Sequence, residues 1–102
     1  MSIDFAKSET HQNLLRAFAG ESQARNRYTF AADLARQQNL QVIEQVFRFT
    51  ANQERAHAKV FYDFLEPLCG QNIAMDASYP VDLSPSVLDQ LRAAQHNEYQ
   101  EW

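Results

Sequence analysis

At the centre of the sequence stands Gln53-Glu54-Arg55-Ala56-His57-Ala58-Lys59, the stretch on which the predicted fold depends. Hydrophobic residues recur around it every three or four positions, which indicates an amphipathic helix. On this period Glu54 and His57 share a row with hydrophobic residues, so we expect both polar side chains to face the core. The full row is Ile43, Phe47, Thr50, Glu54, His57, Phe61 and Phe64.

A carboxylate and an imidazole that both face inward need a common explanation. A charged group in a protein core costs several kcal/mol unless it is paired or bound to a metal. Glu54 and His57 are three residues apart, so they lie on one helical face and can ligate the same ion. The alternative is a helix rotated so that both side chains meet solvent, and the rest of the chain must decide between the two.

The composition describes a small all-α domain. The chain has 102 residues, of which 45 % are hydrophobic and 22 % charged, with only two glycines and three prolines. These proportions are typical of a globular, helical protein and exclude a disordered one. A chain of this length forms one domain with a modest core, so a bound metal or an oligomer is a plausible source of further stability.

Charge and cysteine content limit the partners and the compartment. The net charge is −4 and no basic stripe offsets it, which argues against a nucleic-acid partner. The single cysteine, Cys69, excludes a disulfide or a Cys-x-x-Cys site within this sequence and fits a reducing compartment. The first residues show no signal-peptide pattern, and no hydrophobic run is long enough to span a membrane. We therefore expect a cytoplasmic protein.

A first helix is expected over about residues 9–38, with Ser8 as its cap. Its inward row contains one carboxylate, Glu21, among hydrophobic and aromatic residues. The glutamate either reaches solvent from the edge of the row or, like Glu54, takes part in a buried polar site. The row reads Leu14, Ala17, Glu21, Ala24, Tyr28, Ala31 and Ala35.

A second helix is expected over about residues 40–65, folded back on the first at Asn39, which we interpret as a cap. Glu21 lies eighteen residues before Asn39, while Glu54 and His57 lie fifteen and eighteen residues after it. At 1.5 Å per residue all three are roughly 22–27 Å from the turn. The three side chains should therefore meet at one level, which strongly favours the metal interpretation.

The prolines and Gly70 predict a linker over about residues 66–83. Some seventeen residues can extend about 55 Å, which exceeds the length of the second helix and permits a crossover connection. Ser84 and Pro85 then predict a third helix from about residue 85. An offset of seventy-seven residues aligns Glu98 of this helix with Glu21, although the match is thin evidence of a repeat.

Together these carboxylates suggest a two-metal site. A Glu from each of two helices plus Glu-x-x-His from each of two others is the ligand set of di-iron and di-manganese four-helix bundles. The sequence supplies Glu21, Glu54, His57 and Glu98 of that set. Tyr28, near Glu21, is either a hydrogen-bond donor to a ligand or an ordinary core tyrosine. The remaining histidines, His11 and His96, lie neither at the height of the site along the helices nor on its inward row, so we expect both in solvent.

The segments AFAGESQARNRY, residues 17–28, and QERAHAK, residues 53–59, resemble the di-iron domain of rubrerythrins, and the similarity covers about residues 9–102. The resemblance implies a ferritin-like four-helix bundle with two iron ions, or manganese, held by the residues that match the family ligands. It also implies a peroxidase that reduces hydrogen peroxide to water with electrons from a rubredoxin-like protein or a reductase. Asn97 stands where the family usually has glycine, and the fourth helix and the rubredoxin domain lie outside this sequence. The matching residues are Glu21, Glu54, His57, Glu98 and Glu101.

Two other functions remain open, together with the manner of assembly. Ferritin-like bundles with similar ligands bind and oxidise Fe(II), and a metal-free structural fragment is the third interpretation. Each hairpin of the first two helices offers two Glu and one His, so two hairpins offer the complete set of four Glu and two His. We therefore expect a homo-oligomer, a dimer that is either swapped or paired through the hairpins, unless a further segment of the protein completes the bundle.

Overall fold

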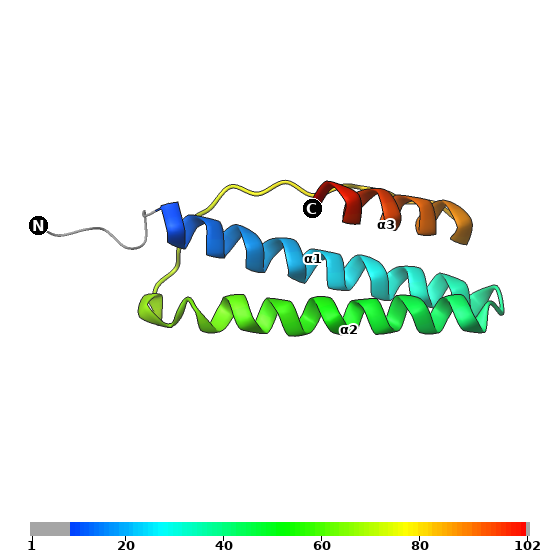
Figure 1. Ribbon diagram of the computed structural model, residues 1–102, viewed down its shortest axis with the longest axis horizontal. Coiled ribbons are helices and arrows are strands. Elements are labelled where there is room, and N and C mark those ends of the chain that lie inside the picture. Colours follow the sequence, from blue (N-terminus) through cyan, green and yellow to red (C-terminus); the bar gives the residue numbers. More distant parts are fainter. Residues whose placement is uncertain (1–8, 102) are drawn as a thin grey trace, which may run out of the picture.

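The computed structural model describes the backbone of residues 9–101 and the side chains of residues 9–96. Its helices are α1 (Glu9–Gln37), α2 (Gln41–Asp63) and α3 (Val87–Glu101), with a short 3₁₀ turn, η2 (Glu66–Leu68), after α2. Within residues 9–101 there is no strand, so the fold is all-α as the sequence predicts (Figure 1). The proposed cap of α1, Ser8, lies outside the described residues. No helix of the described part is long and apolar enough to cross a bilayer.

The turn between α1 and α2 makes these helices antiparallel neighbours (Figure 1). Asn39 has a φ of 58°, in the left-handed region that Asn tolerates better than most residues. The Leu40 amide donates to the Ala35 carbonyl at 2.9 Å and the Asn39 amide to the Arg36 carbonyl at 3.1 Å, the two bonds that close a helix C-terminus around a left-handed residue. Asn39 is therefore a cap between the helices that closes the end of α1, and the residue directly before α2 is Leu40.

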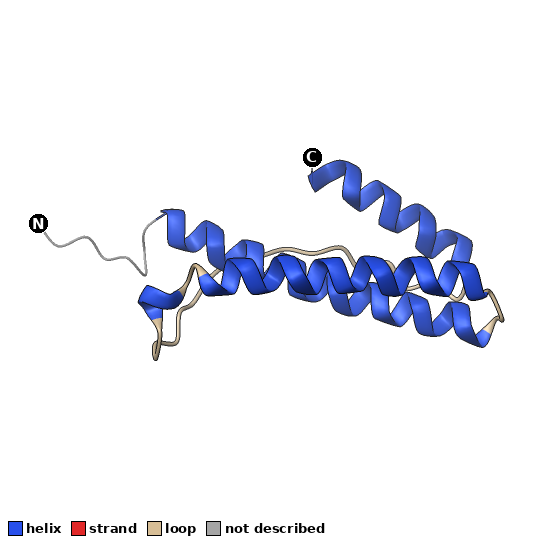
Figure 2. Ribbon diagram, turned by 60° about the horizontal axis from the view of Figure 1, so that its bottom comes forward, coloured by secondary structure: helices blue, strands red, loops and turns tan. Residues whose placement is uncertain are grey.

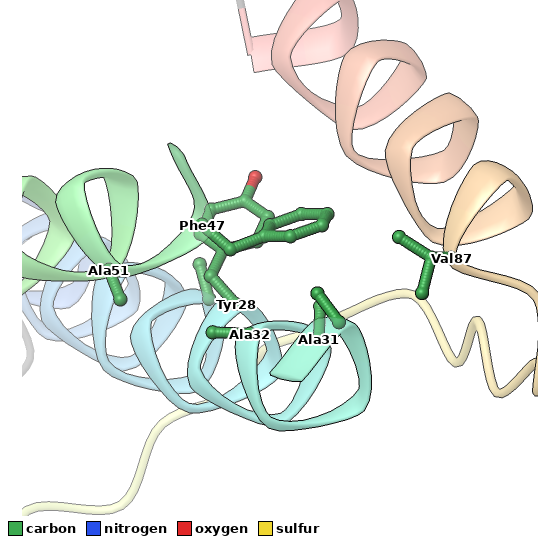
Figure 3. Packing of buried hydrophobic residues seen from close by; sticks show 8 residues of the cluster. Tyr28, Ala31, Ala32, Phe47, Ala51 and Val87 are labelled. Carbon is green, nitrogen blue, oxygen red and sulfur yellow. The ribbon is translucent and has the colours of Figure 1, made fainter. Parts of the chain in front are cut away.

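The core lies between α1 and α2 and continues to the start of α3 (Figure 3). The rings of Tyr28 and Phe47 stack with their centroids 6.2 Å apart and an interplanar angle of 28°. Alanines surround this pair, and their small side chains allow the two helix backbones to approach closely. The buried cluster consists of Ala24, Tyr28, Ala31, Ala32, Ala35, Phe47, Ala51 and Val87.

The buried face of α2 differs from the row that the sequence predicted. Thr50 is half-buried, and Phe64 and His57 are exposed, whereas Ala51 and Ala58 are buried. Phe47 and Glu54 belong to both rows. The helix is thus rotated by about one residue position relative to the predicted row, so that small alanines face α1 over most of its length.

A salt bridge on the surface also joins the two helices. Arg48 of α2 donates to Glu44 at 2.7 Å and, across to α1, to Asp33 at 3.2 Å. Its hydrogen bond to Glu44, followed by that to Asp33, raises the pKa of the Arg48 guanidinium above its ordinary value. Because the guanidinium is solvated, this bridge aligns the helices more than it stabilises them.

The linker after α2 crosses the whole length of the helix pair. Near the start of α1, Gln12 and Arg16 donate to the carbonyls of Ala74 and Asp76 at 3.3 and 3.0 Å. At the other end Gln38 donates to the carbonyl of Pro85 at 2.8 Å. The crossover connection is therefore confirmed, and it makes α3 antiparallel to α1 and parallel to α2 (Figures 1 and 2).

The third helix begins two residues later than predicted. Ser86 caps it, because its hydroxyl accepts the Asp89 amide at 3.3 Å, while the Ser84 hydroxyl accepts the Ser86 amide at 3.1 Å. Among the side chains described for α3, Val87, Leu91 and Ala94 pack on the core. Figure 2 shows α3 leaning away from the α1–α2 pair toward its C-terminal end.

The side of α2 next to His57 carries a second row of hydrophobic side chains that nothing in the described structure covers. Successive members of this row are four, three, eleven and four residues apart, and each of these spacings returns to nearly the same side of a helix. We call them the α2 apolar row: Val42, Val46, Phe49, Val60 and Phe64, which are 51–79 % exposed.

Candidate metal centre

Glu21 of α1 and the pair Glu54 and His57 of α2 come together at one level of the hairpin. One ligand atom of each residue lies within 4.8 Å of the ligand atoms of the other two. The His57 Nδ1 and a Glu21 carboxylate oxygen are 3.7 Å apart. Counting residues from the turn predicted this convergence, and the antiparallel packing of the helices produces it.

The three side chains differ greatly in burial. Glu54 is 6 % exposed, and the side chains of Glu21 and His57 are 20 % and 59 % exposed. The expectation that His57 faces the core is therefore wrong for this chain. Because α2 is rotated to bury Ala58, the imidazole lies at the edge of the α1–α2 interface. The cluster consequently has a buried carboxylate at its base and an imidazole at its open side.

The donors in this cluster suit a divalent transition metal. Two carboxylates held this close repel each other, and a bound cation removes that repulsion. Carboxylate oxygens together with an imidazole nitrogen favour Fe(II) or Mn(II), whereas magnesium and calcium sites are usually built from oxygens alone. Structural zinc sites rely on thiolates and histidines, and no cysteine belongs to this cluster. The residues present therefore fit a divalent transition metal, and they are half of the ligand set that a four-helix bundle uses for two metals.

The two glutamates predicted on α3, Glu98 and Glu101, have side chains outside the described residues. Their backbone nevertheless runs toward the level of the cluster. Val87 packs in the same core cluster as Ala31, and Glu98 lies eleven residues beyond Val87, while Glu21 lies ten residues before Ala31. Since α3 is antiparallel to α1, these spans are nearly equal along the bundle axis. A role for these two glutamates stays a prediction.

The remaining predicted residues have mixed outcomes. Tyr28 is buried, 4 % exposed, and its ring stacks on Phe47, while its role as a hydrogen-bond donor to a ligand stays a prediction. His96 is exposed, as expected. His11 is only 8 % exposed, so the expectation that it lies in solvent is wrong. Sequence reasoning also missed the α2 apolar row, although the spacing of its hydrophobic residues was a readable signal.

Comparison with known proteins supports the same interpretation. The model of the rubrerythrin family matches residues 12–101. The chain is 47 % identical to rubrerythrin of Porphyromonas gingivalis over all of its 102 residues, which are 50 % of that protein. It is 41 % identical to rubrerythrin of Clostridium perfringens and 40 % identical to that of Nitratidesulfovibrio vulgaris, with 92 % of this chain and 49 % of each relative covered.

The chain thus spans about half the length of these curated relatives. No solved structure matches it. The family match over most of the chain agrees with the three-helix architecture and with the Glu-x-x-His cluster. The chain therefore belongs to the rubrerythrin family and forms part of its ferritin-like domain.

Proposed function

We propose that this chain is part of a non-haem di-iron peroxidase that reduces hydrogen peroxide to water. The observation that carries the proposal is the convergence of Glu21, Glu54 and His57 at one level between α1 and α2. Glu98 and Glu101 of α3 are proposed as further ligands, because their backbone approaches that level. Membership of the rubrerythrin family supports iron as the metal, with manganese as a second possibility.

In the proposed reaction, one hydrogen peroxide takes up two electrons and two protons and yields two water molecules. Iron, when bound, supplies the electrons and a binding position for peroxide. The buried Glu54 and the half-buried Glu21 would hold the metal in a fixed position, because both side chains come from helices. The open side of the cluster, beside the exposed His57, admits a molecule as small as peroxide from solvent.

Turnover distinguishes this function from iron oxidation and storage. The chain loaded with Fe(II) and given peroxide with an excess of a chemical reductant should consume many peroxide molecules per centre, while its iron content stays constant. Peroxide consumption and bound iron are both measurable in the same sample. Growth of an iron-oxide particle with consumption limited to the added iron would support the storage function instead, and an iron-free chain would support the structural fragment.

We further propose that the centre is completed by association of two chains, in a paired or a swapped dimer. Supporting this, the α2 apolar row flanks His57 and carries no charge, and two hairpins provide four Glu and two His. Sedimentation should show a dimer whose stability rises with Mn(II), since a ligand shared by two chains favours their association. The double variant Val46→Glu/Phe49→Glu should be monomeric and remain helical. A wild-type monomer indifferent to metal would refute the dimer.

Cytoplasmic localisation is part of the same proposal. Cys69 is exposed and free, which suits a compartment that keeps thiols reduced.

A further inference from the structure

A concavity of about 760 Å³ lies between α1 and α2, on the side of the pair away from α3. Ser22 and Arg25 of α1 line this concavity. A second hollow, on the α3 side of the helix pair, is lined by Ala31 and Leu34, which lie nine residues after Ser22 and Arg25 respectively. Nine residues are two and a half helical turns, so the two sets are on opposite sides of α1. We call this feature the basic concavity, lined by Phe18, Ser22, Arg25, Asn26, Arg55, Ala56, Ala58, Lys59 and Tyr62.

The basic concavity concentrates positive charge in an acidic chain. Three of the nine Lys and Arg residues line it, and no carboxylate does. Lys59 pairs with Asp63, but neither Arg25 nor Arg55 forms an ion pair within residues 9–96. The Nε atom of Arg25 is buried and has no hydrogen-bond partner there, although its Nη1 reaches the Asn26 amide oxygen at 3.3 Å. The exposed Arg55 guanidinium, and the part of the half-buried Arg25 guanidinium that lines the concavity, can therefore pair with an external carboxylate.

The lining resembles a protein interface more than a pocket for a small anion. Arg55, Lys59 and Tyr62 are exposed, so the concavity forms an open surface. Tyr62 packs on Phe18 with a ring-centroid distance of 4.8 Å and remains 59 % exposed. Arginine and aromatic side chains are enriched at the energetic centres of protein interfaces. A single phosphate would leave this aromatic surface and most of the volume unused.

The basic concavity also lies directly behind the metal-ligand cluster. Ser22 and Arg55 follow Glu21 and Glu54 in the sequence, so the two features share one level of the hairpin. On α2, Arg55 is about 200° around the helix from His57, so the concavity and the open side of the cluster face in opposite directions. A protein seated in the concavity would lie behind the helix pair and would leave the open side of the cluster to the second chain and to peroxide.

We propose that the basic concavity is the docking site of an electron-donor protein that presents surface carboxylates. This inference rests on the proposed function, because peroxide reduction consumes two electrons and two protons per molecule. A one-electron carrier would supply them in two encounters and leave oxidised by one electron each time. The local positive charge steers such an acidic donor toward a chain whose overall charge would otherwise repel it.

Binding of a rubredoxin, a one-electron iron protein, tests the proposal without turnover. Calorimetric titration at low ionic strength should show binding to the metal-loaded chain that weakens as salt is added. The variant Arg25→Gln/Arg55→Gln should bind at least about tenfold more weakly, because carboxylate partners of the donor lose both guanidinium groups. The matched control is Arg36→Gln/Arg92→Gln, which removes the same charge from exposed positions outside the concavity and should bind like the wild type.

Three results would overturn the docking site: a wild-type chain that does not bind in a salt-dependent way, a double variant that binds normally, or equal losses in the double variant and the control. Arg25 is half-buried, so the single variant Arg55→Glu at an exposed position provides the same test if the double variant does not fold. Absence of peroxide turnover with a chemical reductant would refute the proposed function alone. The binding titration does not depend on that turnover.

Discussion

Replacement of Glu54 by alanine is expected to remove nearly all bound metal from the purified chain. Glu54 is the most buried of the three clustered side chains, and its carboxylate lies within 4.8 Å of the ligand atoms of Glu21 and His57. Even a residue that only supports a metal ligand usually costs 10–100-fold in affinity when it is removed, so a direct ligand should cost at least about that much. His57→Ala should show a loss of similar size. Elemental analysis after loading with Fe(II) or Mn(II) measures both.

Glu9→Ala is the matched control for these variants. Glu9 is an exposed glutamate in the first turn of α1, about eighteen Å from the cluster along the helix, so its loss should leave occupancy unchanged. The fold should persist in Glu54→Ala, because a small side chain replaces a buried charge beside the alanines of the core. Equal metal loss in all three variants, or in none, would contradict the assignment of the cluster.

Phe47→Ala is expected to destabilise the chain by about 3–5 kcal/mol, the usual cost of removing a buried phenylalanine side chain. Phe47 is 3 % exposed and stacks on Tyr28 where α1, α2 and the start of α3 meet. A domain of this size has a total stability of about 5–15 kcal/mol, so the variant should lose a large part of it. Chemical denaturation followed by circular dichroism, at one fixed chain concentration, measures the change.

Phe30→Ala provides the comparison for that substitution. Phe30 is also helical but 65 % exposed, so its removal should change the free energy of unfolding by no more than about 0.5 kcal/mol. A similar loss in both variants would mean that the stack between Tyr28 and Phe47 is not the centre of the core. A negligible loss in Phe47→Ala would lead to the same conclusion.

The sequence was sufficient to predict the helices and their register, but not the rotation of α2. The predicted row repeats every seven residues, from Ile43 to Thr50 to His57. The buried positions Phe47, Ala51, Glu54 and Ala58 also follow one another at spacings of four and three. The two rows share Phe47 and Glu54 and differ because Ala51 and Ala58 stand in place of Thr50 and His57. Spacing alone cannot choose between neighbouring rows of one helix, and the imidazole lies outside the core because the alanine row faces α1.

Burial at the start of α1 could not be predicted from local patterns. His11 occupies a part of the helix where the linker returns, and the adjacent Gln12 contacts Ala74, sixty-two residues away in the sequence. Such a contact has no counterpart in the periodicity of residues 9–38. In contrast, the position of Glu21, Glu54 and His57 at one height along the hairpin was predictable. A short turn joins two regular helices there, so counting residues from the turn fixes their register.

The crossover linker has a consequence for the dipoles of the three helices. It returns the chain to the α1–α2 turn before α3 begins, so the N-termini of α2 and α3 both lie beside the C-terminus of α1. Each helix carries a partial charge of about +0.5 at its N-terminus and −0.5 at its C-terminus, so two positive ends flank one negative end. A short connection after α2 would have placed α3 parallel to α1, with like ends together. Each doubling of a loop's length costs about 0.6 kcal/mol, so a linker several times longer than a short turn costs about 1–2 kcal/mol more to close. The antiparallel alignment of α3 with α1 offsets part of that cost.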